Sequence, residues 1–278
     1  MTIVRFVRAW WLDAVSLAVA GIVFIVPFVF IVLMAAKDRV EAQRFEFSPP
    51  SEWLLFPNIA EVLDARNGIV VTAMRNSLIL TVASVTILVV LSAMVGYVLQ
   101  RRRDRIGSVV TALMLAGLII PPAIVPTIYV LQSIGLFKTL VGLTLVEVAF
   151  QLPFSVLIFR TFVSSIPREL DEAAIIDGAS SFQLFTHVIF PLLRPAMITV
   201  IVVSAVAVYN DFVNPLYFLP GTENATVQLT LFNFISQMNS RWHLLFADVL
   251  LLTIPPLVMF IFFQRQIVSG MAAGAVKG

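Results

Sequence analysis

Three acidic residues interrupt stretches of sequence that otherwise carry almost no charge. Glu147, Asp211 and Asp248 lie in or near long apolar segments. An ionised side chain is costly in lipid, so such residues by default face a bundle interior, a water-filled cavity or a polar partner. They can carry protons or cations, or accept hydrogen bonds from a polar solute. We regard all three as candidate functional residues, although Asp248 is expected near a membrane interface, where a structural role is the stronger interpretation.

Side-chain amides accompany two of these acids. Gln151 follows Glu147 by four residues, which places both on one face of a helix. Together they offer the hydroxyl groups of a sugar both acceptors and donors. Asn210 and Asn214 flank Asp211 in the chain. For Asp211, the lining of a solute pathway and the capping of a broken helix both remain open.

The composition decides the class of protein. The chain has 278 residues, of which 60% are hydrophobic and 12% charged, and its mean hydropathy is +0.99. Soluble domains have about 25% charged residues, so this chain is predicted to be a membrane protein. It contains no cysteine and only two histidines, His187 and His243. We therefore expect no disulfide, no metal site and no catalytic residue.

The uncharged runs predict six transmembrane helices. About 20 residues are enough to cross the hydrocarbon core. Prolines 121, 122 and 126 should kink or interrupt the third helix, and prolines 255 and 256 should shape the sixth around a cavity. The prediction is an all-α polytopic membrane protein with one transmembrane domain over residues 1–278. Its six spans are expected at residues 14–36, 76–100, 107–131, 139–161, 196–219 and 244–263.

The positions of the basic residues predict the orientation. Six spans place both termini on one side, and Lys and Arg accumulate on the cytoplasmic side of a membrane. The sharpest accumulation is the arginine-rich run 101–105, directly after the second span. We therefore expect both termini, including a tail over residues 264–278, in the cytoplasm. The flank 5–11 combines arginines with tryptophans and lacks a cleavage site, which favours a retained anchor over a signal peptide.

The longest predicted cytoplasmic segment covers residues 164–195 and has the pattern of two short helices. An acidic run, residues 169–172, suits the positive end of a helix dipole. Gly178 can adopt the positive φ that ends a helix. The pair Ser180 and Gln183 then has the form of a capping box, so a second helix should start there and stop before Pro191.

This segment resembles the EAA loop of ABC-importer permeases. Glu172, Ala173 and Ala174 are followed after three residues by Gly178 and later by Pro191. The resemblance is closest to permeases for sugars and related solutes, and four segments carry it: residues 177–180, 191–196, 209–216 and 263–278. Three departures are mild, since Phe190 stands where leucine is usual, Val188 where isoleucine is common and Tyr209 where tryptophan is frequent. The second half of the chain matches well, the first half mainly through topology.

The resemblance implies a type I ABC-importer permease fold in a bacterial cytoplasmic (inner) membrane. It implies four kinds of partner: a homologous second permease, two nucleotide-binding ATPase subunits that bind ATP and Mg, an extracytoplasmic solute-binding protein and membrane lipid. Residues 37–75 and 220–241 would face the binding protein. No nucleic-acid partner is expected. No enzymatic activity of this chain is expected either, because the sequence has no Gly-Lys-Ser or Gly-Lys-Thr phosphate loop that could bind ATP.

The same resemblance assigns roles to individual residues. The expected solute is an oligosaccharide or other polyol, whose identity depends on a pocket shared by two permeases. The residues implied in coupling to the ATPase are Glu172, Ala173, Ala174, Asp177, Gly178 and Pro191, and the candidates for the substrate path are Glu147, Gln151, Asn210, Asp211 and Asn214.

Two rival functions remain at this point. An ion-gradient-driven secondary transporter or channel would use Glu147, Asp211 and Asp248 as its proton or sodium path, but it leaves the loop unexplained. An intramembrane enzyme would need a nucleophile or a metal set, and His187 and His243 are both expected outside the spans.

Overall fold

The described part of the chain is entirely helical. The computed structural model describes the backbone of residues 3–102, 104–235 and 240–275, and no strand occurs among them. Lipid cannot satisfy exposed backbone N–H and C=O groups, so a chain this apolar must satisfy them within helices. The predicted all-α class is confirmed. Arg103 of the predicted arginine run and residues 276–278 of the predicted tail lie outside the described residues.

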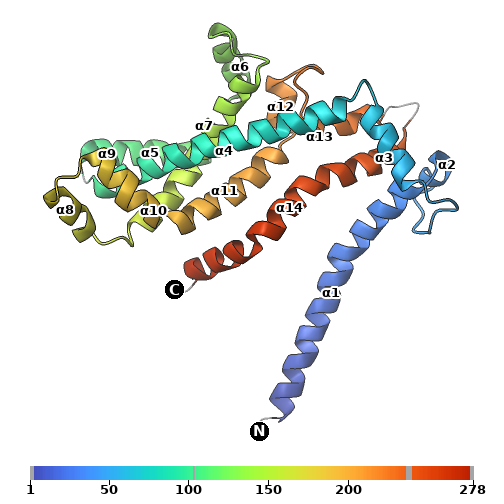
Figure 1. Cartoon of the computed structure of the whole chain (residues 1–278), viewed down its shortest axis with the longest axis horizontal. Coiled ribbons are helices and arrows are strands. Elements are labelled where there is room, and N and C mark those ends of the chain that lie inside the picture. The colour runs from blue at the N-terminus through green and yellow to red at the C-terminus, as the bar shows by residue number, and fades with distance from the viewer. Residues whose placement is uncertain (1–2, 103, 236–239, 276–278) are drawn as a thin grey trace. The chain divides into compact units, whose positions relative to one another are not determined.

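The helices are labelled in Figure 1. Their bounds are α1 Ile3–Ala36, α2 Arg39–Ala42, α3 Leu55–Asp64, α4 Ile69–Arg101, α5 Arg105–Ile119, α6 Ile124–Ser133, α7 Leu140–Val163, α8 Glu169–Ile176, α9 Ser181–Gln183, the π-helical turn η1 Leu184–Ile189, α10 Phe190–Leu192, α11 Arg194–Tyr209, α12 Val213–Phe218, α13 Val227–Thr230, the 3-10 turn η2 Leu231–Asn233 and α14 Trp242–Ala275.

Four described helices are long and apolar enough to cross a membrane by themselves. They are Asp13–Ala36, Ile69–Arg101, Leu140–Val163 and Trp242–Gln264, which contain or overlap the expected first, second, fourth and sixth spans. Two bent helix pairs reach the same length and hydropathy, so the number of spans is six if each pair crosses once.

The third expected span is interrupted where its prolines predict. Helix α5 ends at Ile119 and α6 starts at Ile124, with a bend of 116° between them. Pro121 and Pro122 lie in the gap; neither has a backbone N–H, and each fixes its own φ. The expected range 107–131 is therefore two helices rather than one.

The prediction of one helix over residues 196–219 is wrong. Helix α11 ends at Tyr209 and α12 begins at Val213. The carboxylate of Asp211 accepts the backbone N–H groups of Val213 at 2.8 Å and Asn214 at 3.3 Å. A short acidic side chain that captures nearby N–H groups competes with the helical ladder, which explains why the helix breaks here.

The chain forms two compact units. The first comprises residues 1–71 and 230–254. Within it the amide of Asn58, on α3, donates hydrogen bonds to the carbonyl groups of Ala35 at 2.8 Å and Lys37 at 2.9 Å. These carbonyls lie at the end of α1, where no further helical turn can satisfy them. Phe30 of α1 also packs edge-on against Phe246 of α14, with ring centroids 5.7 Å apart.

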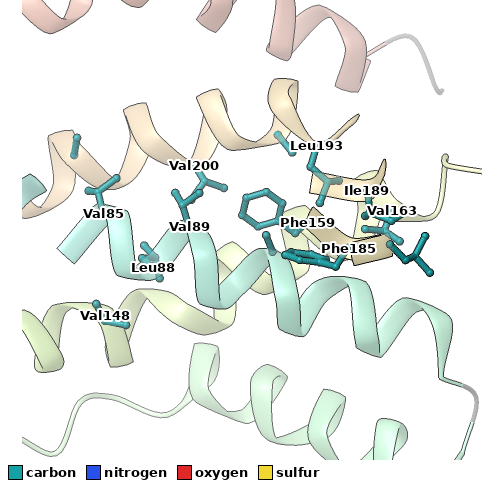
Figure 2. Close-up of a cluster of buried hydrophobic side chains, with 14 residues drawn as sticks. Val85, Leu88, Val89, Val148, Phe159, Val163, Phe185, Ile189, Leu193 and Val200 are labelled. Carbon is teal, nitrogen blue, oxygen red and sulfur yellow. The ribbon is translucent and has the colours of Figure 1, made fainter. Parts of the chain in front are cut away.

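The second unit comprises residues 72–229 and 255–278 and has its own apolar core. Helices α4, α7 and α11 contribute most of this core, and the segment from Leu184 to Leu193 contributes the rest. Figure 2 shows Phe159 of α7 surrounded by Val89, Val200 and Ile189 from three other segments of the chain. The loop predicted to be cytoplasmic is thus packed into the helix bundle.

Gly96 lies where α4 closely approaches α7. A Cβ atom at this position would lie 2.8 Å from Cβ of Phe159 and 3.0 Å from the backbone nitrogen of Arg160. Real Cβ atoms do not approach other atoms this closely, so any side chain here would force the two helices apart.

We therefore expect Gly96→Val to destabilise the folded chain by about 1–3 kcal/mol, since the core cannot yield without moving a helix backbone. Gly21→Val is the matched control, because a Cβ at Gly21 would meet only Ile25 Cδ1 at 3.9 Å. The measurement is the fraction of complex that stays monodisperse after heating in detergent. Equal heat stability of the two variants would contradict the close packing.

Candidate functional site

The predicted coupling loop is a helix, a glycine turn and a second helical segment. Helix α8 ends at Ile176, and Gly178 has φ +83°, a conformation that residues with side chains rarely adopt. Ser180 then accepts the backbone N–H of Gln183 at 3.3 Å, while Gln183 Oε1 accepts the N–H of Ser180 at 2.9 Å. This is the reciprocal capping box that the sequence indicates.

The second helical segment does not stop before Pro191, which corrects the prediction. It widens into the π-helical turn η1 and continues through α10 to Leu192. The N–H of Phe190 bonds to the carbonyl of Phe185, five residues back. The backbone at Phe190 therefore already departs from the usual pairing of residue i with residue i−4. Pro191, which follows it and has no N–H, interrupts no regular α-helical hydrogen bond. The bend of 74° follows at Leu193, between α10 and α11.

The two faces of this loop differ in how far they are exposed. Leu184, Phe185, Ile189 and Leu193 are buried in the core of the second unit. The opposite face exposes apolar side chains, with Ile175, Ile176 and Phe182 at 61%, 84% and 70% of full exposure. The residues expected to couple lie mainly on this outer face: Glu172, Ala173, Asp177, Gly178 and Pro191 are exposed, whereas Ala174 is half-buried against the core.

One acid of the loop points inward, and sequence reasoning missed it. Asp171 is buried, and its carboxylate lies 2.6 Å from Nη2 of Arg101 and accepts the hydroxyl of Tyr97 at 2.8 Å. Arg101 was interpreted only as part of a topology-determining run. The sequence signal was weak, since the three acids of the run 169–172 look alike and both partners lie some 70 positions earlier.

The polar residues of α7 and α12 come together as a second site in the same unit. Glu147 is 2% exposed, and its two carboxylate oxygens accept the amides of Gln151 at 3.2 Å and Asn214 at 3.1 Å. The backbone N–H of Asn214 also donates to Asp211. Asn214 therefore connects two of the three acids that the sequence singled out, Glu147 and Asp211, although Asn214 and Glu147 are 67 positions apart in the chain.

Asn210 is positioned at the edge of this polar cluster. It forms the cap of α11, and its side-chain oxygen accepts the amide of Gln228 at 3.2 Å. All five predicted substrate-path residues thus lie on α7 or on the broken segment 209–218. The arrangement offers hydrogen-bond acceptors and amide donors at membrane depth, which suits a solute with many hydroxyl groups.

The remaining candidates have other surroundings. Asp248 is fully buried in the first unit and accepts the hydroxyl of Thr230 at 2.9 Å. His243 is also buried and lies within the candidate span of α14, not outside it as expected. His187 is exposed, with its ring beside Thr186 and the carbonyl of Gln183, as a surface residue should be.

A cavity of 540 Å³ lies elsewhere in the second unit, between α4, α11 and the second half of α14. Its walls are mostly valine, methionine and proline, and Val85, Met197 and Pro256 are typical of them. Such walls offer a saccharide few hydrogen-bond partners, so the polar cluster is the better candidate for solute contact.

A bundle of apolar helices long enough to cross a membrane, with a helix–turn–helix of the EAA spacing and no Gly-Lys-Ser or Gly-Lys-Thr in its sequence, has the features of an importer permease. The comparison with known families agrees: residues 89–273 match the family described as "Binding-protein-dependent transport system inner membrane component". The chain belongs to this family, and the predicted resemblance to ABC-importer permeases is confirmed. The gradient-driven and enzymatic alternatives are set aside.

Individual relatives cover most of the chain. The melibiose/raffinose/stachyose import permease protein MelC of Bacillus subtilis is 32% identical over 73% of this chain and 75% of its own length. The diacetylchitobiose uptake system permease protein NgcG of Streptomyces coelicolor is 31% identical over 92% of this chain and 85% of its own. Among solved structures, a bacterial ABC transporter involved in the import of the acidic polysaccharide alginate has the same fold, with a TM-score of 0.79, 20% identity and coverage of 94% of this chain and 97% of its own.

The hydrogen bonds of the polar cluster allow a test of its cohesion. We expect Glu147→Leu to destabilise the protein by about 1–2 kcal/mol, because the amides of Gln151 and Asn214 both lose the buried carboxylate that accepts them. Glu147→Gln keeps one acceptor oxygen and should cost less than half as much. The measurement is the heat stability of the purified complex. If the leucine variant is as stable as the wild type, the two amides do not depend on Glu147.

Proposed function

We propose that this permease forms half of the translocation pathway for an oligosaccharide and is driven by ATP hydrolysis on partner subunits. The observation that carries the proposal is the coupling loop, which is anchored in the bundle core on one face and presents an unpartnered apolar and acidic face on the other. No ATP chemistry is required of this chain. Its partners bind ATP and Mg.

The exposed face of the loop supports docking to an ATPase. Ile175, Ile176 and Phe182 expose apolar surface that a cytoplasmic loop would otherwise bury, and exposed apolar patches mark interaction sites. Glu172 adds a negative charge beside them, suited to a basic partner. Gly178 sets the turn between the two helical segments, so the docking face has a fixed shape.

The polar cluster supports a saccharide as the transported solute. Glu147 and Asp211 supply acceptors, and Gln151, Asn210 and Asn214 supply amides that donate and accept. Hydroxyl groups can exchange with such partners one at a time. The sugars named for MelC and NgcG are oligosaccharides of the same chemical type.

The family description supports the remaining partners. A binding-protein-dependent system requires an external solute-binding protein, and we propose that residues 37–75 and 220–241 face it. A homologous second permease would complete the pathway, with two ATPase subunits on the cytoplasmic side. In this arrangement both termini of the chain lie in the cytoplasm.

The coupling proposal is tested with the double variant Glu172→Lys, Gly178→Asp in the complete complex, reconstituted in lipid with its binding protein. We expect the complex to assemble but to lose stimulation of ATPase activity by loaded binding protein, because the docking face has the wrong charge and turn. Asp13→Lys, an exposed charge reversal outside the loop, is the control. Full stimulated turnover of the double variant would refute the role of the loop.

The pathway proposal is tested with Asn214→Ala. This change removes the amide that connects Glu147 to Asp211, and we expect uptake of labelled oligosaccharide to slow about 10-fold or more, which corresponds to about 1.4 kcal/mol of lost binding in the pathway. Gln132→Ala, which removes an exposed amide on α6 outside the cluster and outside the segments proposed to face the binding protein, is the control. Unchanged uptake by the Asn214 variant would exclude the cluster from the pathway.

A further inference from the structure

An ion pair connects the cytoplasmic end of α4 to helix α8 of the coupling loop. Nη2 of Arg101 lies 2.6 Å from one carboxylate oxygen of Asp171, and the hydroxyl of Tyr97 donates to the other at 2.8 Å. Both oxygens of a loop residue are therefore held by α4. The Arg101 and Asp171 side chains are only 16% and 13% exposed, so water screens their attraction weakly.

Further contacts fix the direction of this connection. Tyr97 and Arg101 are four residues apart on α4, so they share one helix face, and the guanidinium carbon lies 5.9 Å from the centroid of the tyrosine ring. Arg101 also donates to the carbonyl of Ile166, before α8 begins, at 3.2 Å. On its other side the Tyr97 ring lies 5.8 Å from the ring of Phe185, in the second half of the loop.

Helix formation does not explain the buried acid. Glu169 and Glu172 already place negative charge in the first turn of α8, and both are exposed. A shielded ion pair is also a poor source of stability, since apolar residues of similar volume often stabilise as well. The ion pair instead fixes the distance and direction between α4 and α8, because charge attraction and hydrogen bonds act between the same side chains.

We propose that Tyr97, Arg101 and Asp171 form a joint through which displacement of the coupling loop passes into α4. The proposal rests on the function of the loop proposed above. From α4 the displacement reaches α7, because Gly96 brings the two helices into backbone contact near Phe159. Helix α7 carries Glu147 of the polar cluster, so the joint connects the ATPase side of the chain to its solute side.

The first test measures whether α8 and α4 move together. The chain has no cysteine, so spin labels can be attached at Glu169→Cys on α8 and Val98→Cys on α4, both exposed positions. In the complete complex we expect the label-to-label distance to be the same without nucleotide and after trapping with Mg-ATP and vanadate. With Asp171→Asn added, the distance should shift or broaden on trapping. A shift of the same size in the chain with intact Asp171 would overturn the proposal.

The second test measures coupling. We expect Asp171→Arg to lower the ratio of stimulated to basal ATPase activity about fivefold or more, and Arg101→Glu combined with Asp171→Arg to restore most of it. Tyr97→Phe, which removes one hydroxyl, should give a smaller loss. Glu169→Gln is the control, an exposed acid two residues away. A purely structural role would lower assembly and melting temperature and leave the ratio of the assembled complex unchanged.

The outcomes separate this proposal from the proposed function. A wild-type complex without ATP-dependent uptake would refute the function itself. A wild-type complex that transports, together with an Asp171→Arg variant that assembles and keeps its full stimulation ratio, would refute the joint alone. If the Asp171→Arg variant does not assemble, the joint is still tested by the stimulation ratio of Tyr97→Phe and by the spin-label distance measured with intact Asp171.

Discussion

The structure depends on one constraint, that a backbone in lipid must satisfy its own hydrogen bonds. A continuous helix meets this constraint within itself, and α4 does so over 33 residues. A break is tolerated where side chains accept the freed N–H groups or where proline has no N–H to satisfy. At residues 210–212 the carboxylate of Asp211 accepts the N–H groups that begin α12, and at residues 120–123 two of the positions are prolines without an N–H. At both of these breaks, a side chain or a proline thus takes the place of the missing helical hydrogen bonds.

The same helices determine how the loop can act. Phe159, Ile189 and Val200 pack around one point, so the second half of the loop is part of the bundle rather than an appendage. Asp171 holds the first half by charge. An element fixed at both ends by different kinds of interaction transmits displacement, whereas a loop fixed at one end would absorb it.

Much of this organisation could be predicted from the sequence. The class followed from the uncharged runs, and the glycine turn and capping box followed from Gly178, Ser180 and Gln183, because these signals act over a few residues. Residue type indicated Glu147 and Asn214 as separate candidates for the substrate path, but their contact depends on the break after Tyr209. The sequence left open whether Asp211 caps a broken helix, because an acid in an apolar run does not reveal whether it captures backbone N–H groups. The pairing of Asp171 with Arg101 was missed because it is a contact between distant segments, set by how α4 packs on the loop.

Asp211 has two attachments, and they constrain how this lineage can diversify. Its carboxylate accepts the backbone N–H groups of Val213 and Asn214 at the start of α12, and the side-chain amide of Asn214 in turn bonds to Glu147 of the polar cluster. A change of residue 211 that altered cargo preference would also unravel a helix end, so selection should reject it. Gln151 makes its contact through a side-chain tip alone. Under the pathway proposed above, we expect changes at position 151 to alter the cargo with less damage to the fold than changes at position 211.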